Sequence, residues 1–100
     1  MNLMAMSGGE HAEMTVVKKT LEPRRPRTLM QAHRELVRIR PSRDASLAAW
    51  LAYYRRSVLV YEQIAETDPG HDGEARYWAQ RERTRAHNIA ARIRALAPGE

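Results

Sequence analysis

The sequence contains no cysteine, so no disulfide can reinforce the fold and no thiolate can bind a metal. The absence of cysteine also fits a reducing compartment. No stretch approaches the roughly 18 consecutive apolar residues of a membrane-spanning helix. The N-terminal region has no continuous apolar run after basic residues, as a signal peptide would have. These absences predict a cytoplasmic protein that does not span a membrane.

Sequence patterns typical of enzymes and metal sites are also missing. No two histidines are spaced three or four residues apart, and there is no His-Glu-x-x-His motif. There is no glycine-rich phosphate loop and no Gly-x-Ser-x-Gly elbow. A thin helical domain of about 70 residues offers little concave surface for a ligand. We therefore expect a protein that is not an enzyme and has no catalytic residues, metal, cofactor or small-molecule substrate.

Aromatic residues are confined to one part of the chain. All six lie on either side of one turn sequence, Thr67–Asp72: Trp50, Tyr53, Tyr54, Tyr61, Tyr77 and Trp78. Residues 1–27 have no aromatic side chain and no sustained apolar period, so they cannot bury enough apolar area to offset the entropy of ordering. The sequence therefore predicts a disordered basic tail and linker over residues 1–27 and a small helical domain over residues 28–97.

Apolar residues recur at helical spacing in three segments of the domain, which predicts an all-α fold. The first helix is expected to begin at Thr28, which forms a capping box with Gln31, and to end before Pro41. The second is expected over about residues 45–66 and the third over about residues 73–96. The last two helices should form an antiparallel hairpin, with the shorter N-terminal helix on one side.

Aspartates precede both hairpin helices. Asp44 and Asp72 are predicted to be their N-cap residues, because aspartate side chains accept hydrogen bonds from the first backbone amides of a helix. The apolar arc of the second helix covers about 180°, which is wider than the stripe of a simple surface helix. We therefore place the second helix between the first and the third.

One polar residue interrupts the apolar arc of each hairpin helix. In an antiparallel hairpin centred on the turn, Trp78 should lie near Tyr61, and Glu82 should lie opposite Ser57. The first interpretation of Ser57 and Glu82 is a polar core layer that fixes the register of the helices, as single polar core residues do in coiled coils. The second interpretation is a carboxylate that the hairpin presents to a partner or ligand.

The chain is basic, with a net charge of +5, and Lys18 and Lys19 are the only lysines among its 17 basic residues. Five residues of the linker are candidates for contacts with phosphates: Lys18, Lys19, Arg24, Arg25 and Arg27. Glu22 interrupts this segment, and no aromatic residue is interleaved for stacking on bases. Binding of nucleic acid through the linker and first helix is therefore the alternative function.

One sequence pattern has a family resemblance. The run Trp50–Ser57 (Trp-Leu-Ala-Tyr-Tyr-Arg-Arg-Ser), then Tyr61, and later Ala75–Ala79 with Glu82, resembles an uncharacterised family of small actinobacterial helical proteins. The arginine-rich and alanine-rich composition agrees with a GC-rich genome of that kind. The resemblance implies a short helical cytoplasmic protein and brings no assigned activity or site residues.

The small core suggests how such a protein works. A domain of this size has a stability margin of only roughly 3–5 kcal/mol unless something reinforces it. With neither disulfide nor metal available, association with another protein or a second copy is the obvious reinforcement. The sequence therefore predicts a helical interaction or accessory protein that associates with itself and supports a larger partner.

Overall fold

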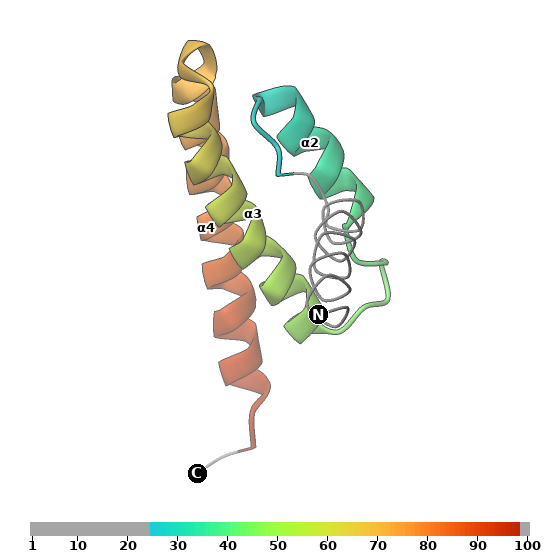
Figure 1. The fold of residues 1–100 in the computed structure, drawn as a ribbon. Coiled ribbons are helices and arrows are strands. Elements are labelled where there is room, and N and C mark those ends of the chain that lie inside the picture. The colour runs from blue at the N-terminus through green and yellow to red at the C-terminus, as the bar shows by residue number, and fades with distance from the viewer. Residues whose placement is uncertain (1–24, 99–100) are drawn as a thin grey trace, which may run out of the picture.

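The computed structural model describes residues 25–98, and this part of the chain is all-α. Its helices are α2 (Leu29–Arg38), α3 (Leu47–Thr67) and α4 (Asp72–Leu96), with a short 3-10 helix, η1 (Pro69–His71), before α4. Helices α3 and α4 form an antiparallel hairpin, and the shorter α2 lies beside it near the turn (Figure 1). The predicted fold class is confirmed. The prediction of disorder was made for residues 1–27, of which residues 1–24 lie outside the described residues; within the remainder, the Arg27 backbone is hydrogen-bonded to the side chains of Gln31 and Thr67.

Helix α2 begins with the predicted cap in a modified form. The Thr28 hydroxyl accepts a hydrogen bond from the backbone amide of Gln31 at 3.2 Å. The Gln31 side chain accepts in return from the backbone amide of Arg27, at 2.8 Å, one residue earlier than in the standard capping box. Helix α2 ends at Arg38, as expected ahead of Pro41.

The two predicted aspartate N-caps are wrong. Ser46 is the N-cap of α3, and its hydroxyl accepts from the backbone amide of Ala49 at 3.1 Å. Asp44 lies inside a turn closed by a hydrogen bond from the Ala45 amide to the Ser42 carbonyl, so the chain enters α3 two residues later. Asp72 is the first residue of α4, where its negative charge suits the positive end of the helix dipole.

The buried core lies where α2 covers the hairpin near its turn. Its buried apolar residues are Leu29, Ala32, Leu36, Tyr61, Ile64, Ala75 and Ala79. The alanines of α4 let the hairpin helices approach closely, and the larger side chains of α2 and α3 fill the space above them. Helix α3 packs along α4 and also against α2, which confirms the central position predicted from its wide apolar arc.

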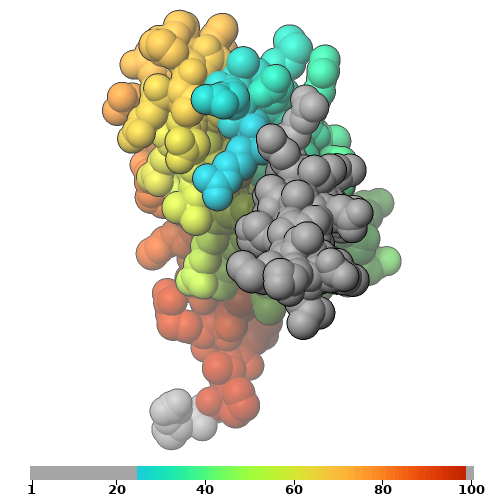
Figure 2. All heavy atoms as spheres, in the orientation of Figure 1, coloured from blue at the N-terminus to red at the C-terminus, as the bar shows by residue number. Residues whose placement is uncertain are grey.

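The core does not continue to the far end of the hairpin. We call residues 47–56 of α3 and 84–96 of α4 the open half, and the remainder the turn half. In the open half Ala86 is the one residue that is buried. The last turns of α4 extend beyond α2 and the α2–α3 loop (Figure 2). No helix within residues 25–98 is long and apolar enough to cross a membrane.

Candidate interaction surface

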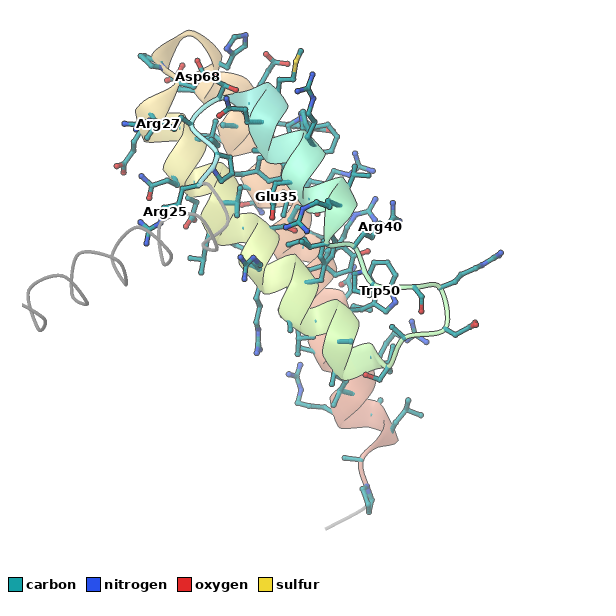
Figure 3. The ribbon with its side chains drawn as sticks, turned by 45° about the vertical axis from the view of Figure 1, so that its right-hand side comes forward. Arg25, Arg27, Glu35, Arg40, Trp50 and Asp68 are labelled. Carbon is teal, nitrogen blue, oxygen red and sulfur yellow. The ribbon has the colours of Figure 1, made fainter. Side chains whose placement is uncertain are left out.

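Asp68 joins the hairpin turn to the start of α2. Its Oδ2 atom accepts from the backbone amide of Leu29 at 2.9 Å and lies 3.1 Å from Nδ1 of His71. Next to it, the Thr67 hydroxyl donates to the backbone carbonyl of Arg27 at 2.9 Å. Asp68 and Arg27 therefore lie side by side where the chain enters α2 (Figure 3). These bonds fix the entry of α2 to the turn.

Asp68 and His71 shift each other's titration. The hydrogen bond from the Leu29 amide, followed by that from His71, lowers the pKa of Asp68 below its ordinary value of 3.8. The same contact with Asp68 raises the pKa of His71 above 6.5. The Asp68 contribution to stability is therefore present above pH 3.8 and lost as the pH falls through the lowered pKa. The His71 contribution is present below pH 6.5 and lost as the pH rises through the raised pKa.

Replacing Asp68 should loosen α2 from the hairpin. Asp68→Ala removes the acceptor for the Leu29 amide, so we expect faster hydrogen exchange of the α2 amides and a lower melting temperature. The matched control is Asp72→Ala, which removes an exposed acid from the same turn and should leave α2 protected. Unchanged exchange of the α2 amides in Asp68→Ala would show that the apolar contacts alone hold α2.

An aromatic cluster lies between α2 and the turn half of the hairpin. The rings of Tyr61 and Trp78 stack with centroids 6.0 Å apart, which confirms the predicted pairing. His33 of α2 packs edge-on against both rings, and its Nδ1 atom lies 2.7 Å from the Tyr61 hydroxyl oxygen. Burial raises the pKa of Tyr61 to about 12, so its hydroxyl stays protonated and joins α2 to α3. The cluster serves the packing of three helices.

Ser57 and Glu82 have separate partners in the structure. Ser57 is fully buried, and its hydroxyl donates to the Tyr53 carbonyl one turn earlier in α3, at 2.9 Å. Such a bond satisfies the hydroxyl within its own helix. The Glu82 side chain is 12% exposed, and its Oε2 atom lies 3.7 Å from Nε of Arg85. Burial raises the pKa of Glu82, against the opposing charges of Arg85, Arg81 and Arg40. Among the described residues, no hydrogen bond joins Ser57 to Glu82.

The aromatic residues of the open half are only partly covered. The Trp50 ring contacts the rings of Tyr53 and Tyr54, with centroids 5.7 and 5.6 Å away. The Arg40 guanidinium lies over Trp50, 5.4 Å from the ring centroid (Figure 3). The Arg85 guanidinium lies over Tyr54. Trp50 is half-buried and lies outside the core cluster. Arginines from the loop and from α4 thus cover part of this aromatic surface.

The hairpin has a second face, on the side away from α2, that sequence reasoning missed. Two shallow hollows of about 470 and 500 Å³ lie along the seam of α3 and α4 and share Arg83 in their linings. On α3, Tyr53 faces α2, where its hydroxyl donates to the Leu36 carbonyl. Arg55 lies about 160° around the helix from Tyr53, so it is on the opposite side of α3. We call this surface the outer face. Its residues are Arg55, Val58, Leu59, Glu62, Ala65, Glu66, Arg76, Ala79, Gln80, Arg83, Ala86, His87, Ala90 and Arg94.

Charges on the outer face are only partly paired within the chain. Arg83 forms an ion pair with Glu62 across the seam. Within residues 25–98, three charged groups of this face have no ion-pair partner: Arg55, Glu66 and Arg94. The acid is at the turn end of the face, and the two arginines are at the open end. The sequence signal for this face was the spacing of residues 55, 58, 59, 62, 65 and 66, which follows one side of a helix.

The candidate phosphate contacts are only partly within the described residues. Lys18, Lys19 and Arg24 lie outside them. Arg25 and Arg27 are exposed, and the backbone of Arg27 is used in the cap of α2. The structure brings neither arginine into an aromatic cluster.

Neither metal-binding geometry among the described residues nor comparison with known proteins points to a functional site. Residues 25–98 contain no group of three or more histidine, aspartate or glutamate side chains arranged to hold a metal ion. No family model matches this chain, and no curated protein or solved structure matches it either. The resemblance to small actinobacterial proteins stays a prediction. The outer face and the partly covered aromatic surface of the open half are therefore the candidate sites that the described residues offer.

Proposed function

We propose that this chain is a small non-enzymatic interaction protein of the cytoplasm that associates with itself and supports a larger partner. The observation that carries the proposal is the position of the core. Buried apolar side chains gather in the turn half, whereas the open half buries only Ala86 among its residues. Within residues 25–98 no helix covers the open half, so a second protein surface there would add stability.

Exposed apolar side chains support the same proposal. Leu59 of α3 is 67% exposed, and Leu96 near the end of α4 is 72% exposed. Single exposed apolar residues are common on protein surfaces. Here, however, Leu59 adjoins Val58, Ala86 and Ala90 along one hollow. Continuous apolar surface of this kind is typical of association sites.

Self-association predicts that stability depends on protein concentration. Self-association involves folded chains and not unfolded ones, so it stabilises the folded state more at higher concentration. The melting temperature of the full chain should therefore rise as its concentration increases. Sedimentation equilibrium over the same concentrations should show a reversible change from monomer to dimer. A melting temperature that does not change with concentration, together with a sedimenting mass equal to that of a monomer at every concentration, would contradict self-association.

Nucleic-acid binding remains the second candidate, because arginines lie over the partly exposed aromatic rings of Trp50 and Tyr54. Single-stranded nucleic acid binds surfaces that combine basic groups with stacking aromatic rings. The two candidates differ in their response to salt. Binding to an oligonucleotide that weakens steeply as salt increases, by a chain that remains monomeric, would favour this second function.

A further inference from the structure

We propose that the outer face binds the outer face of a second copy in antiparallel orientation, forming a four-helix bundle of two hairpins. This inference rests on the proposed self-association and specifies its geometry. Hairpins that bury one long face against a symmetry mate are a standard way to complete a four-helix core. A two-fold axis would cross the face near Leu59, at the middle of the α3 stripe.

The surface of the outer face suits helix packing. Small and apolar side chains line the seam between flanking polar groups: Val58, Leu59, Ala65 and Ala90, with Ala79 and Ala86 already buried at the bottom of the seam. Alanine permits close approach of two helices, and Leu59 is the largest apolar side chain exposed on this face. Near a two-fold axis, Leu59 would pack close to its own symmetry mate and lose most of its exposure.

Charge complementarity identifies the second copy as the partner. Arg55 and Glu66 are five and a half residues on either side of the centre of the α3 stripe, or about 8 Å along the helix. An antiparallel two-fold rotation about that centre places Arg55 of each copy beside Glu66 of the other. Both groups lack an ion-pair partner within the described part of their own chain. Two ion pairs therefore form by symmetry.

The last turns of α4 lie beyond the overlap of the two copies. The centre of the α3 stripe is level with Trp78 and Ala79 of α4, so Arg94 is about 23 Å along the helix from the axis, whereas the turn of the second copy reaches only about 14 Å on that side.

A parallel arrangement would set α3 against α4 of the second copy at the same level, with Arg55 close to His87. In that arrangement Arg55 has no acid of the second copy opposite it. Glu66 lies near Arg76, which already pairs with Asp72 of its own helix. The antiparallel arrangement pairs both Arg55 and Glu66 and is therefore favoured.

The size of the outer face predicts a weak, reversible dimer. Its α4 stripe runs from Arg76 to Arg94, about 27 Å, and two helices side by side are about 20 Å wide. Two such faces bury roughly 1,000 Å², which is near the lower limit of specific interfaces. We therefore expect a dissociation constant of roughly 1–100 μM.

Charge reversal tests the orientation directly in the full chain. Arg55→Glu and Glu66→Arg each place like charges opposite one another twice per dimer, so each should raise the dissociation constant by about tenfold at low salt. The double variant Arg55→Glu/Glu66→Arg recreates both pairs with reversed polarity, and its dissociation constant should return to within about threefold of the original. Arg56→Glu, the same change at the next residue and outside the face, is the matched control.

The outcomes separate the two proposals. A wild-type chain that stays monomeric overturns both. A wild-type dimer that Arg55→Glu and Arg56→Glu weaken equally, or that the double variant does not recover, overturns the antiparallel outer-face dimer and leaves self-association standing. Helicity measured by circular dichroism should be the same in all variants, and a variant that loses helicity is replaced by Arg55→Gln or Glu66→Gln, for which about threefold weakening is expected.

The lack of cysteine provides a second measurement, because any disulfide in a single-cysteine variant joins two chains. Oxidised Leu59→Cys should form a covalent dimer that remains helical. Leu96→Cys, at an equally exposed position, should not, because the antiparallel arrangement sets the two ends of α4 far apart. Cross-linking of Leu96→Cys alone would mean that the copies meet end to end and would overturn the proposal.

Discussion

Trp78→Ala should unfold most of the protein at room temperature. The Trp78 ring stacks on Tyr61, packs edge-on against His33 and lies under the Arg81 guanidinium, so its loss removes contacts to two other helices. Truncating a large aromatic residue in a core costs about 3–5 kcal/mol, and the lower end applies to a ring that is half-buried. A domain this small has only roughly 3–5 kcal/mol to lose. Urea titration followed by circular dichroism measures the change.

The neighbouring Tyr77 offers a matched control. Its side chain is 62% exposed, so Tyr77→Ala removes an aromatic ring of similar size from the same helix at a cost of less than about 0.5 kcal/mol. Nothing in the sequence ranks Trp50 below Trp78, because both flank the predicted turn. Because the structure places Trp50 outside the core cluster, Trp50→Ala should cost less than Trp78→Ala. Equal urea midpoints for Trp78→Ala and Tyr77→Ala would contradict the assignment of Trp78 to the core.

The features that the sequence predicted correctly depend on local signals or on simple helix arithmetic. Helical spacing and the positions of Pro41 and Pro69 were enough to locate the three helices. Antiparallel numbering around the turn was enough to pair Tyr61 with Trp78. Both kinds of signal are repeated along many residues, so one misleading position does not change the result.

Features that depend on a single competing contact could not be predicted. Asp44 and Ser46 are both good N-cap residues, and the choice of Ser46 depends on the turn that the Ser42 carbonyl closes. The hydrogen bond from the Leu29 amide to Asp68 joins residues that are 39 positions apart. No local sequence pattern predicts a contact between residues so far apart in the chain.

The outer face escaped prediction for a related reason. Leu59 falls outside the apolar arc of its helix, and an isolated leucine on a polar side has no meaning in the sequence alone. Its importance depends on which side of the hairpin α2 covers. Once α2 is placed on the side of Ile64, Leu59 and Val58 are on the face left open.

Glu82→Gln should stabilise the protein at neutral pH. Burial raises the pKa of Glu82 above its ordinary value of 4.5, so the folded state holds its proton more tightly than the unfolded state. Ionisation of Glu82 therefore opposes folding, and this cost appears as the pH rises from about 4.5 through the raised pKa. Glutamine is neutral at every pH. The variant should match the wild type at low pH and be more stable than it at pH 7, as measured by urea titration at both pH values.

Arg85 is the group that could reverse this result. It loses an ion-pair partner in Glu82→Gln, but its side chain is 41% exposed and also contacts the Tyr54 hydroxyl, at 3.4 Å. No buried charge is left alone, so the usual penalty of a broken buried pair does not apply. Glu35→Gln is the matched control on α2, outside the outer face: because Arg38 lowers the pKa of Glu35, its ionisation favours folding, and this variant should not gain stability at pH 7. A Glu82→Gln variant less stable than the wild type at pH 7 would show that the Arg85 pair outweighs burial.

Glu82→Leu then tests whether the polar residue fixes the register of the hairpin. Leucine continues the apolar stripe of α4, so it should keep or raise stability while removing the carboxylate that acts on both Tyr53 and Tyr61. If Glu82 fixes the register, the variant should populate several registers or oligomers, because apolar side chains pack in more than one alignment. Broadened amide resonances and several sedimenting species would show this. A variant that gives one sharp species but no longer binds a cellular partner would make Glu82 a recognition residue instead.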